Sequence, residues 1–481
     1  MHAPRRVTLF VLAMMNTAIV VGLEGLPEVG SFGLSLIVWY ALFTVLFFLP
    51  VGLVSAELGV GFPHEGGVYL WVKEGLGPRS ALVAVWCQWI QILVWYPTVL
   101  AVCAVSAGYA IHPDMADSPW FVLLISLGVF WFATVANFRG LHATGSMTTW
   151  FLYLGTILPV VLAIALAAWW LLSGHASAIP LEASALVPQI GSIGQFVGIL
   201  AIFSFLSGLE VNAVHFNRVK NPQRSIPIAL LISGVLVLVL SVLGALSVAI
   251  MVPVHDIDFA AGTLQVFNHV LGPMGVGWIV RIIAVLALIG MIGHIMIWVI
   301  GPTESIRVAA RDGLVPPALQ RVTAGGAPRN VMLLQACVVS LICLLMLTLD
   351  MNSVFYVLTI VSAQIYLVMY TLMFISAIAL RIRRPDVERV FKVPGGRWGI
   401  WVVAGGGALT CVSGIVLMLV PPEMESVHFS SRWFTPIVGG VLVVMLAVPL
   451  VVYRWRNPTW KASVDDDIET KTPDRQWKRG D

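Results

Sequence analysis

The sequence predicts an all-α protein that crosses a membrane many times. Apolar residues make up 59% of the 481 residues and charged residues only 11%, a composition far from that of soluble domains. Twelve apolar runs are each long enough to cross a bilayer as a helix. Two of these runs carry glycines and a carboxylate near their middle, which predicts helices that are broken at membrane depth.

The apolar runs divide the chain into twelve expected spans and two shorter helices. The segments 62–77 and 257–271 are expected to be short helices that lie at an interface or re-enter the membrane. Residues 1–456 would form a single transmembrane domain, and the polar segment 457–481 is predicted to be a disordered cytoplasmic tail. The expected spans are residues 7–30, 34–60, 80–111, 119–138, 147–173, 192–216, 226–252, 275–311, 331–349, 353–380, 399–420 and 434–455.

The distribution of charge orients these spans. If the N-terminus and alternate loops face the cytoplasm, that side holds 25 of the 27 Lys and Arg residues. Only Arg281 and Arg432 then fall at the other face, whose loops carry mainly Asp and Glu. Because cytoplasmic loops are enriched in Lys and Arg, the pattern predicts a multi-pass protein of the cell membrane with both termini in the cytoplasm.

The first span is interrupted at its centre by the segment Ala18–Pro27, AIVVGLEGLP. Glycines and a proline weaken the helix there, and the freed backbone groups are tolerated only where they are buried in protein or line a water-filled cavity. Glu24 lies in the same segment, and an ionisable group at membrane depth indicates a functional site. We therefore expect an unwound helix centre with Glu24 in it.

A second interruption, FLSGLE at residues 205–210, falls in the sixth span. It lies five spans after the first and enters from the opposite side, so residues 7–173 and 192–380 are expected to form two inverted repeats, with helices 11 and 12 at 399–455. Transporters with this arrangement bind substrate near the midplane, between the broken helices, whose N-terminal ends suit a carboxylate. The expected substrate-binding residues are Val21, Gly22, Leu23, Glu24, Gly25, Ser204, Phe205, Ser207, Gly208 and Glu210.

Three motifs occur in the same order as in a known family. Residues 50–78, PVGLVSAELGVGFPHEGGVYLWVKEGLGP, contain a Glu, a Pro, a Gly-Gly-x-Tyr and a Gly-Pro. Residues 208–227 contain Gly-x-Glu followed by Lys-Asn-Pro-x-Arg-x-x-Pro, and residues 310–322 read ARDGLVPPALQRV. Over about 450 residues, these motifs resemble the amino acid–polyamine–organocation (APC) transporter superfamily.

Within that superfamily the chain is similar to the bacterial glutamate/GABA antiporters, on WVIGP (298–302), FKVPGG (391–396) and Pro-Pro-Glu (421–423). The resemblance implies a twelve-span exchanger of amino acids in a bacterial inner membrane, with five-plus-five inverted repeats. Two features depart from it. The tail is short and lacks histidine, whereas that branch carries a longer tail that plugs the cytoplasmic mouth at neutral pH. His294 stands where the branch has a glutamate in the middle of span eight.

Each titratable candidate has an alternative reading. Glu24 could pair with a substrate amino group or be a neutral, hydrogen-bonded structural carboxyl. Glu210 could couple protons or tether the ends of the broken helix. His294, added to the substrate site by the resemblance, could contact substrate, sense pH or pack as a neutral imidazole. If Glu24, Glu210 and His294 act as proton-coupling or pH-sensing groups, exchange of acidic or zwitterionic substrate should become faster as pH falls.

Other polar and aromatic residues have structural explanations. Glu57 and Glu304 are expected to form ion pairs with nearby arginines. The tryptophans of span three are expected to pack or anchor at the interface, although one of them, or Phe205, could close over substrate as a gate. Gln91, Gln364 and Tyr366 could line the transport path or bridge helices.

Three functions are compatible with these features. The first is a secondary active amino acid exchanger for glutamate, GABA or related substrates, working by alternating access. The second is a proton-coupled symporter or uniporter of amino acids or polyamines, and the third is a non-transporting membrane sensor. We expect no cofactor, metal site, enzymatic activity or nucleic-acid partner, because no nucleophile–base pairing, metal-ligand spacing or phosphate loop occurs. The expected partners are small amino acids and the lipid bilayer, and a homodimer is left open.

Overall fold

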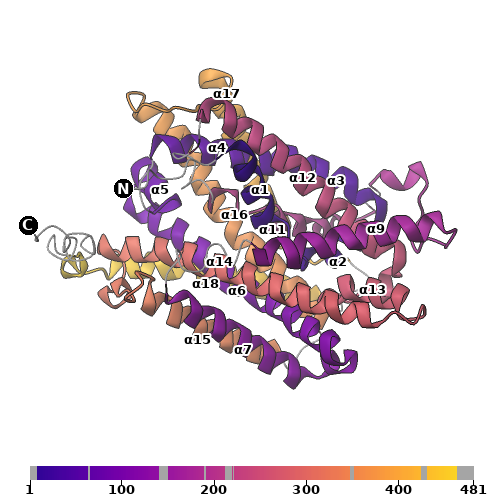
Figure 1. The fold of residues 1–481 in the computed structure, drawn as a ribbon. Coiled ribbons are helices and arrows are strands. Elements are labelled where there is room, and N and C mark those ends of the chain that lie inside the picture. The colour runs from indigo at the N-terminus through magenta and orange to yellow at the C-terminus, as the bar shows by residue number, and fades with distance from the viewer. Residues whose placement is uncertain are drawn as a thin grey trace, which may run out of the picture.

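A computed structural model describes residues 8–62, 66–139, 150–188, 191–211, 219, 221–346, 351–423 and 431–462. These residues form a bundle of helices (Figure 1). The helices are α1 (Leu9–Val20), α2 (Gly25–Gly30), α3 (Leu36–Phe43), α4 (Leu49–Gly61), α5 (Val68–Leu76), α6 (Pro78–Ile111), α7 (Pro119–Asn137), α9 (Leu158–Leu172), α10 (Ile193–Gly198), α11 (Ile202–Phe205), α12 (Pro222–Met251), α13 (Gly262–Leu271), α14 (Trp278–Arg311), α15 (Arg329–Met346), α16 (Met351–Arg383), α17 (Gly396–Leu417) and α18 (Ser431–Arg454).

Ten helical segments of the described chain are long and apolar enough to cross a membrane, and one of them, Ile193–Val211, contains the second break. They coincide with ten of the twelve expected spans. The turn η2 (Thr44–Phe48) joins α3 to α4, and η4 (Tyr153–Ile157) precedes α9, so each of these spans is one continuous helix. The protein is therefore an all-helical, multi-pass membrane protein.

The two remaining expected spans differ for local reasons. Span 7–30 is divided into α1 and α2, and neither piece alone is long enough to cross a bilayer. Span 331–349 corresponds to α15, whose apolar part is shorter than the other spans, and residues 347–350 lie outside the described residues. The short helices expected within 62–77 and 257–271 are α5 and α13.

The long helices α6, α14 and α16 form the centre of the bundle, and α6 packs along both of the others. The backbones of η4 and α14 approach closely, because a Cβ atom added to Gly155 would lie 2.3 Å from the backbone of Gly290. Small residues at such crossings let membrane helices pack backbone to backbone. In Figure 1, α5 and the end of α18 lie at one end of the bundle, on the left, and α13 lies towards the other end.

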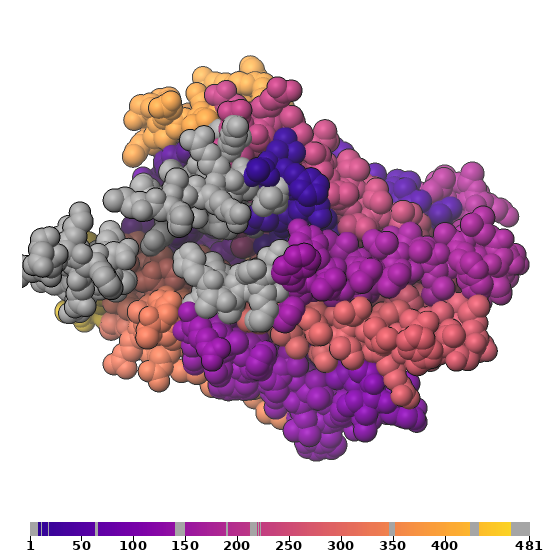
Figure 2. Space-filling model, viewed as in Figure 1, coloured from indigo at the N-terminus to yellow at the C-terminus, as the bar shows by residue number. Residues whose placement is uncertain are grey.

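The outer surface of the bundle is apolar. Figure 2 shows α9, α14 and α7 as successive bands across one face. Leu162, Ile282 and Leu124, one on each of these helices, are exposed large apolar side chains. Extended apolar surface of this kind is unfavourable in water and suits the hydrocarbon of a bilayer.

Both interruptions expected from the sequence occur in the structure. Regular helix stops at Val20 and starts again at Gly25. The segment formed by α10, the single turn η6 (Ile199–Ala201) and α11 stops at Phe205, and residues 206–211 follow it without regular α-helix. Helix ends therefore lie close to both motifs that carry the candidate site residues.

Residues Asn457–Ala462, which the sequence assigned to the tail, form a turn that includes η10 (Pro458–Trp460). The amide of Ala462 donates to the carbonyl oxygen of Arg311 at 3.0 Å, and Gln320 donates to the carbonyl oxygen of Trp460 at 2.7 Å. The start of the tail is thus fixed against the end of α14.

Candidate functional site

The first break places a carboxylate and an aromatic ring over two glycines. The carboxylate of Glu24 folds back over Gly22, where an added Cβ atom would lie 2.3 Å from a carboxylate oxygen. The ring of Phe205 rests on Gly25, where an added Cβ atom would lie 2.5 Å from the ring. The missing side chains therefore make room for Glu24 and Phe205, and the contact of Phe205 with Gly25 joins the two broken helices.

The second break depends on the backbone of Gly208. Its φ of +110° is a conformation that residues with a Cβ atom rarely adopt. Its amide donates to the hydroxyl of Tyr370 at 2.8 Å, and a Cβ atom there would lie 2.9 Å from the ring of Trp298. Gly208 thus lets the chain turn while the indole packs directly against it.

Between the two breaks lies a small cavity. Five helices contribute to its wall: α1, α6, α11, α14 and, with one residue, α16; Glu24 and Ser207 are added by the two breaks. The aromatic part of the wall is continuous, since the Trp95 ring lies 5.4 Å from His294 and 6.0 Å from Trp298 between ring centres. The lining residues are Ile19, Val20, Glu24, Gln91, Ile92, Trp95, Ser204, Phe205, Ser207, His294, Trp298 and Tyr366.

The cavity is closed around a very small space of about 30 Å³. That volume is enough for water but far below the about 300–1,000 Å³ of ordinary small-molecule pockets. A larger hollow of about 790 Å³ is lined by Gln195, Phe196 and Ile199, which precede Ser204 and Phe205 on the same helical segment. Side chains must therefore move before a substrate of the size of an amino acid can fit between the two breaks.

Only part of the expected site lines this cavity. Five predicted residues do: Glu24, Ser204, Phe205, Ser207 and His294. The other six predicted residues, Val21, Gly22, Leu23, Gly25, Gly208 and Glu210, do not line the cavity. Sequence analysis missed Ile19, Val20, Ile92 and Trp298 as cavity residues, because an apolar side chain in a helix looks the same whether it packs or lines a path.

Two titratable side chains of the cavity have unsatisfied atoms among the described residues, as does the indole nitrogen of Trp298. One carboxylate oxygen of Glu24 and both ring nitrogens of His294 are buried without a hydrogen-bond partner among the described residues. The Ile19 carbonyl faces the His294 ring, but not with hydrogen-bond geometry. Buried polar groups are almost always paired, so these atoms indicate a place for water or a ligand.

Glu210, by contrast, is surrounded by donors. Its carboxylate accepts hydrogen bonds from the hydroxyls of Tyr366 and Tyr370, the latter at 2.6 Å, and from the side-chain amide of Gln88 at 3.3 Å. These contacts tie the second break to α16 and α6. Tyr366 both binds Glu210 and lines the cavity, so it performs the two roles that its sequence position left open.

A second fully buried carboxylate in α2 was missed by sequence analysis. Glu28 has no exposed surface, and neither of its oxygens has a hydrogen-bond partner within the described part of the chain. Near this carboxylate lie the side chains of Thr359, Tyr40 and Tyr356. In the sequence, the only feature that pointed to Glu28 was its position one residue after Pro27.

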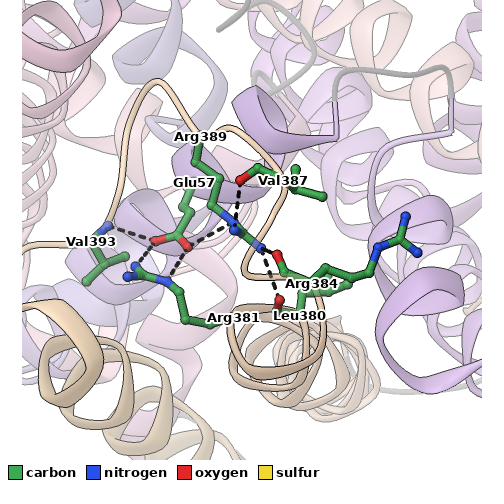
Figure 3. A network of polar contacts seen from close by, with 7 residues as sticks. All are labelled: Glu57, Leu380, Arg381, Arg384, Val387, Arg389 and Val393. Carbon is green, nitrogen blue, oxygen red and sulfur yellow. Dashed lines mark hydrogen bonds and ion pairs between the residues drawn. The ribbon is translucent and has the colours of Figure 1, made fainter.

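At the end of the bundle that bears α5, Glu57 is the centre of a buried ion-pair network (Figure 3). Arg381 donates to it from Nε at 2.7 Å, the Val393 amide donates at 2.8 Å, and Arg389 lies 3.4 Å away. Arg389 also donates to the carbonyl oxygens of Leu380 and Arg384. The expected structural ion pair of Glu57 is confirmed.

Burial lowers the pKa of Arg389, and the nearby Glu57 carboxylate acts in the opposite direction by stabilising the charged guanidinium.

A second expected ion pair, between Glu304 and Arg307 on one face of α14, is also present. Asp312 accepts from Tyr69 and from Lys73, the latter at 2.5 Å, and burial together with Asp312 raises the pKa of Tyr69. These contacts fasten α5 to the end of α14.

The chain matches known membrane transporters over most of its length. A model of the amino acid permease family matches residues 6–444. An uncharacterised transporter of Legionella pneumophila is 32% identical over 449 residues, which are 93% of this chain and 96% of that protein. A glutamate/gamma-aminobutyrate antiporter of Lactococcus lactis is 26% identical over 476 residues, 98% of this chain and 94% of the antiporter.

A putrescine transporter of Escherichia coli is 26% identical over 388 residues, 79% of this chain and 82% of that transporter. These relatives are transporters and not enzymes, in agreement with the sequence-based expectation. Because the family model covers most of the residues, and because the described helices are those of a multi-pass membrane protein, the chain belongs to the amino acid permease family of the APC superfamily.

Proposed function

We propose that the chain is a secondary active exchanger of small amino acids, with glutamate, GABA or a closely related compound as substrate. One observation carries the proposal: a closed cavity between two helix breaks that holds an unsatisfied carboxylate and an unsatisfied imidazole. The name of the Lactococcus lactis relative, a glutamate/gamma-aminobutyrate antiporter, supports this substrate class.

In this proposal the substrate lies between residues 21–25 and 204–210, with His294 beside it. Glu24 binds the amino group of the substrate, because a buried carboxylate forms a charge-assisted hydrogen bond with an ammonium group. Ser204, Ser207 and Gln91 supply neutral hydrogen-bonding groups, and Phe205 covers the ligand. The site residues that do not line the closed cavity, such as Gly25 and Gly208, act by leaving space for Phe205 and Trp298.

The same proposal includes twelve spans with five-plus-five inverted repeats, both termini in the cytoplasm and transport by alternating access. The small closed cavity and the larger hollow on the same helical segment support alternating access, since a carrier must close the site between its two open states. Reporter fusions after Arg6 and after Tyr453 test the topology, and a periplasmic signal from either would contradict it.

A second candidate is a proton-coupled symporter or uniporter of amino acids or polyamines. It is supported by the cavity's acidic residue, Glu24, which also suits a polyamine, and by the putrescine relative. An exchanger needs substrate on both sides of the membrane for net flux of label, whereas a symporter needs only a proton gradient.

Purified protein in liposomes separates the two candidates. We expect uptake of labelled glutamate or GABA only into liposomes preloaded with unlabelled substrate. Glu24→Gln should abolish most of this uptake, while Glu182→Gln, a matched change in an exposed loop, should leave it unchanged. Equal uptake into empty and preloaded liposomes under a pH gradient would favour the symporter, and no uptake of any amino acid or polyamine would refute both.

A further inference from the structure

We propose that a basic pocket beside the tail turn binds the headgroup of an anionic phospholipid. The pocket has a volume of about 1,090 Å³ and lies between α5, the start of α6, the end of α14, the end of α18 and the turn at Asn457–Ala462. One acidic residue, Asp312, lines it. The basic residues that line it are Lys73, Arg79, Arg454, Arg456 and Lys461.

Most of this positive charge is not neutralised by the protein. Lys73 is paired with Asp312 at 2.5 Å. The other four basic side chains are exposed and have no acidic partner in the ranges that the structure describes. Several cations held around one concave surface are repelled by one another and attract an anion with several oxygen atoms.

The pocket is fixed in shape by contacts that do not involve a ligand. The guanidinium of Arg456 stacks on the ring of Tyr453 at 3.8 Å, which leaves its donors free at the edge. Gly313, with a φ of +78°, lies against Lys461, whose backbone nitrogen would be 2.9 Å from an added Cβ atom. The hydrogen bonds of Trp460 and Ala462 described above hold the same turn, so Lys461 is carried by an anchored segment.

The surroundings of the pocket favour a lipid over a free anion. Leu450 and Val451 of α18, a membrane-spanning helix, form an apolar part of its wall. Trp455 beside them is 75% exposed, and tryptophan at the end of a membrane helix is typical of the headgroup level. A phospholipid matches both parts, because its phosphate can meet the arginines while its acyl chains follow α18.

The chain also contains a competing anion. Asp465, Asp466 and Asp467 follow Lys461 closely in the sequence. They could neutralise the arginines but have no group that would cover Leu450 and Val451. A phospholipid supplies an anionic group and acyl chains in one molecule, whereas the three aspartates supply only charge.

Native mass spectrometry of the full-length purified protein tests the proposal. Phosphatidylglycerol and phosphatidylcholine are added in equal amounts, and we expect retained adducts of phosphatidylglycerol. The double variant Arg454→Gln/Arg456→Gln should weaken this binding about 25-fold, since each basic residue contributes about fivefold. The matched double variant Arg321→Gln/Arg397→Gln, at two exposed arginines outside the pocket, should bind like the parent.

Three results would overturn the proposal. The first is equal retention of the two lipids, or equal loss in both double variants. The second is tight binding of inorganic phosphate that displaces the lipid, which would identify a free anion as the ligand. The third is lipid binding that appears only after deletion of residues 463–481, which would assign the pocket to the acidic segment. Unchanged thermal stability of the Arg454→Gln/Arg456→Gln protein ensures that lost binding is not lost folding.

Discussion

Glu24 and Glu57 are both buried carboxylates in the first quarter of the chain, yet their surroundings are opposite. Glu57 is held by two arginines and a backbone amide, whereas Glu24 lies in a cavity with aromatic rings and has an unpaired oxygen. A buried acid with complete partners stabilises one arrangement of helices. A buried carboxylate without such partners destabilises the folded protein. It is retained where a ligand or a proton supplies the missing interaction.

The comparison predicts its largest effect at Glu57. Glu57→Gln leaves Arg381 and Arg389 buried without their counter-charge, so we expect a loss of about 3–5 kcal/mol in the free energy of unfolding. The measurement is thermal unfolding in detergent together with the yield of folded protein. Glu74→Gln is the matched control, because Glu74 is partly exposed and 3.6 Å from Arg384, and it should cost less than about 1 kcal/mol. Equal effects of the two changes would show that burial of the network is unimportant.

Gly208→Ala is expected to have the next largest effect. The φ of +110° strains any residue with a Cβ atom by about 1–3 kcal/mol, and the new methyl group meets the Trp298 ring. Substrate binding, measured by isothermal titration or by competition in liposomes, should weaken at least about tenfold. Gly128→Ala in α7 has open space around its Cβ position and serves as the control. Normal binding by both variants would move the substrate site away from the second break.

Glu24→Gln tests the other side of the comparison. If Glu24 binds the substrate amino group, the loss of a charge-assisted hydrogen bond should reduce the rate of exchange about ten- to one-hundredfold. Unfolding should change by less than about 1 kcal/mol, because no protein cation loses its partner. Rapid exchange combined with a large loss of stability would mean that Glu24, like Glu57, is structural.

Sequence reasoning located the fold and both breaks because composition, run length and glycine–carboxylate clusters are local signals. It also found the pairing of Glu57, since a carboxylate near a basic loop has an obvious partner. It could not show that Glu24 and Glu210 have different surroundings, because each lies two residues after a glycine in a broken span. Their difference arises from Tyr366, Tyr370 and Gln88, which come from helices far away in the sequence. Glu28 was missed for the same reason, as only the packing of α2 shows that it is fully enclosed.

The pH dependence of exchange is the smallest expected effect and separates the titratable groups. A substrate carboxylate beside His294 favours the charged form of the imidazole, so exchange of glutamate should become faster from neutral to mildly acidic pH. Glu210 does not line the cavity, and its carboxylate accepts hydrogen bonds from hydroxyl and amide donors. His294 lines the cavity, and both of its ring nitrogens lack a hydrogen-bond partner among the described residues. We therefore expect His294→Ala to flatten the pH–rate profile in liposomes more than Glu210→Gln does. His269→Ala, a histidine in α13 outside the cavity, should keep the parent profile. If the profiles of the parent, His294→Ala and Glu210→Gln proteins superimpose, neither residue sets the pH response, and Glu24 becomes the remaining titratable group of the cavity to test.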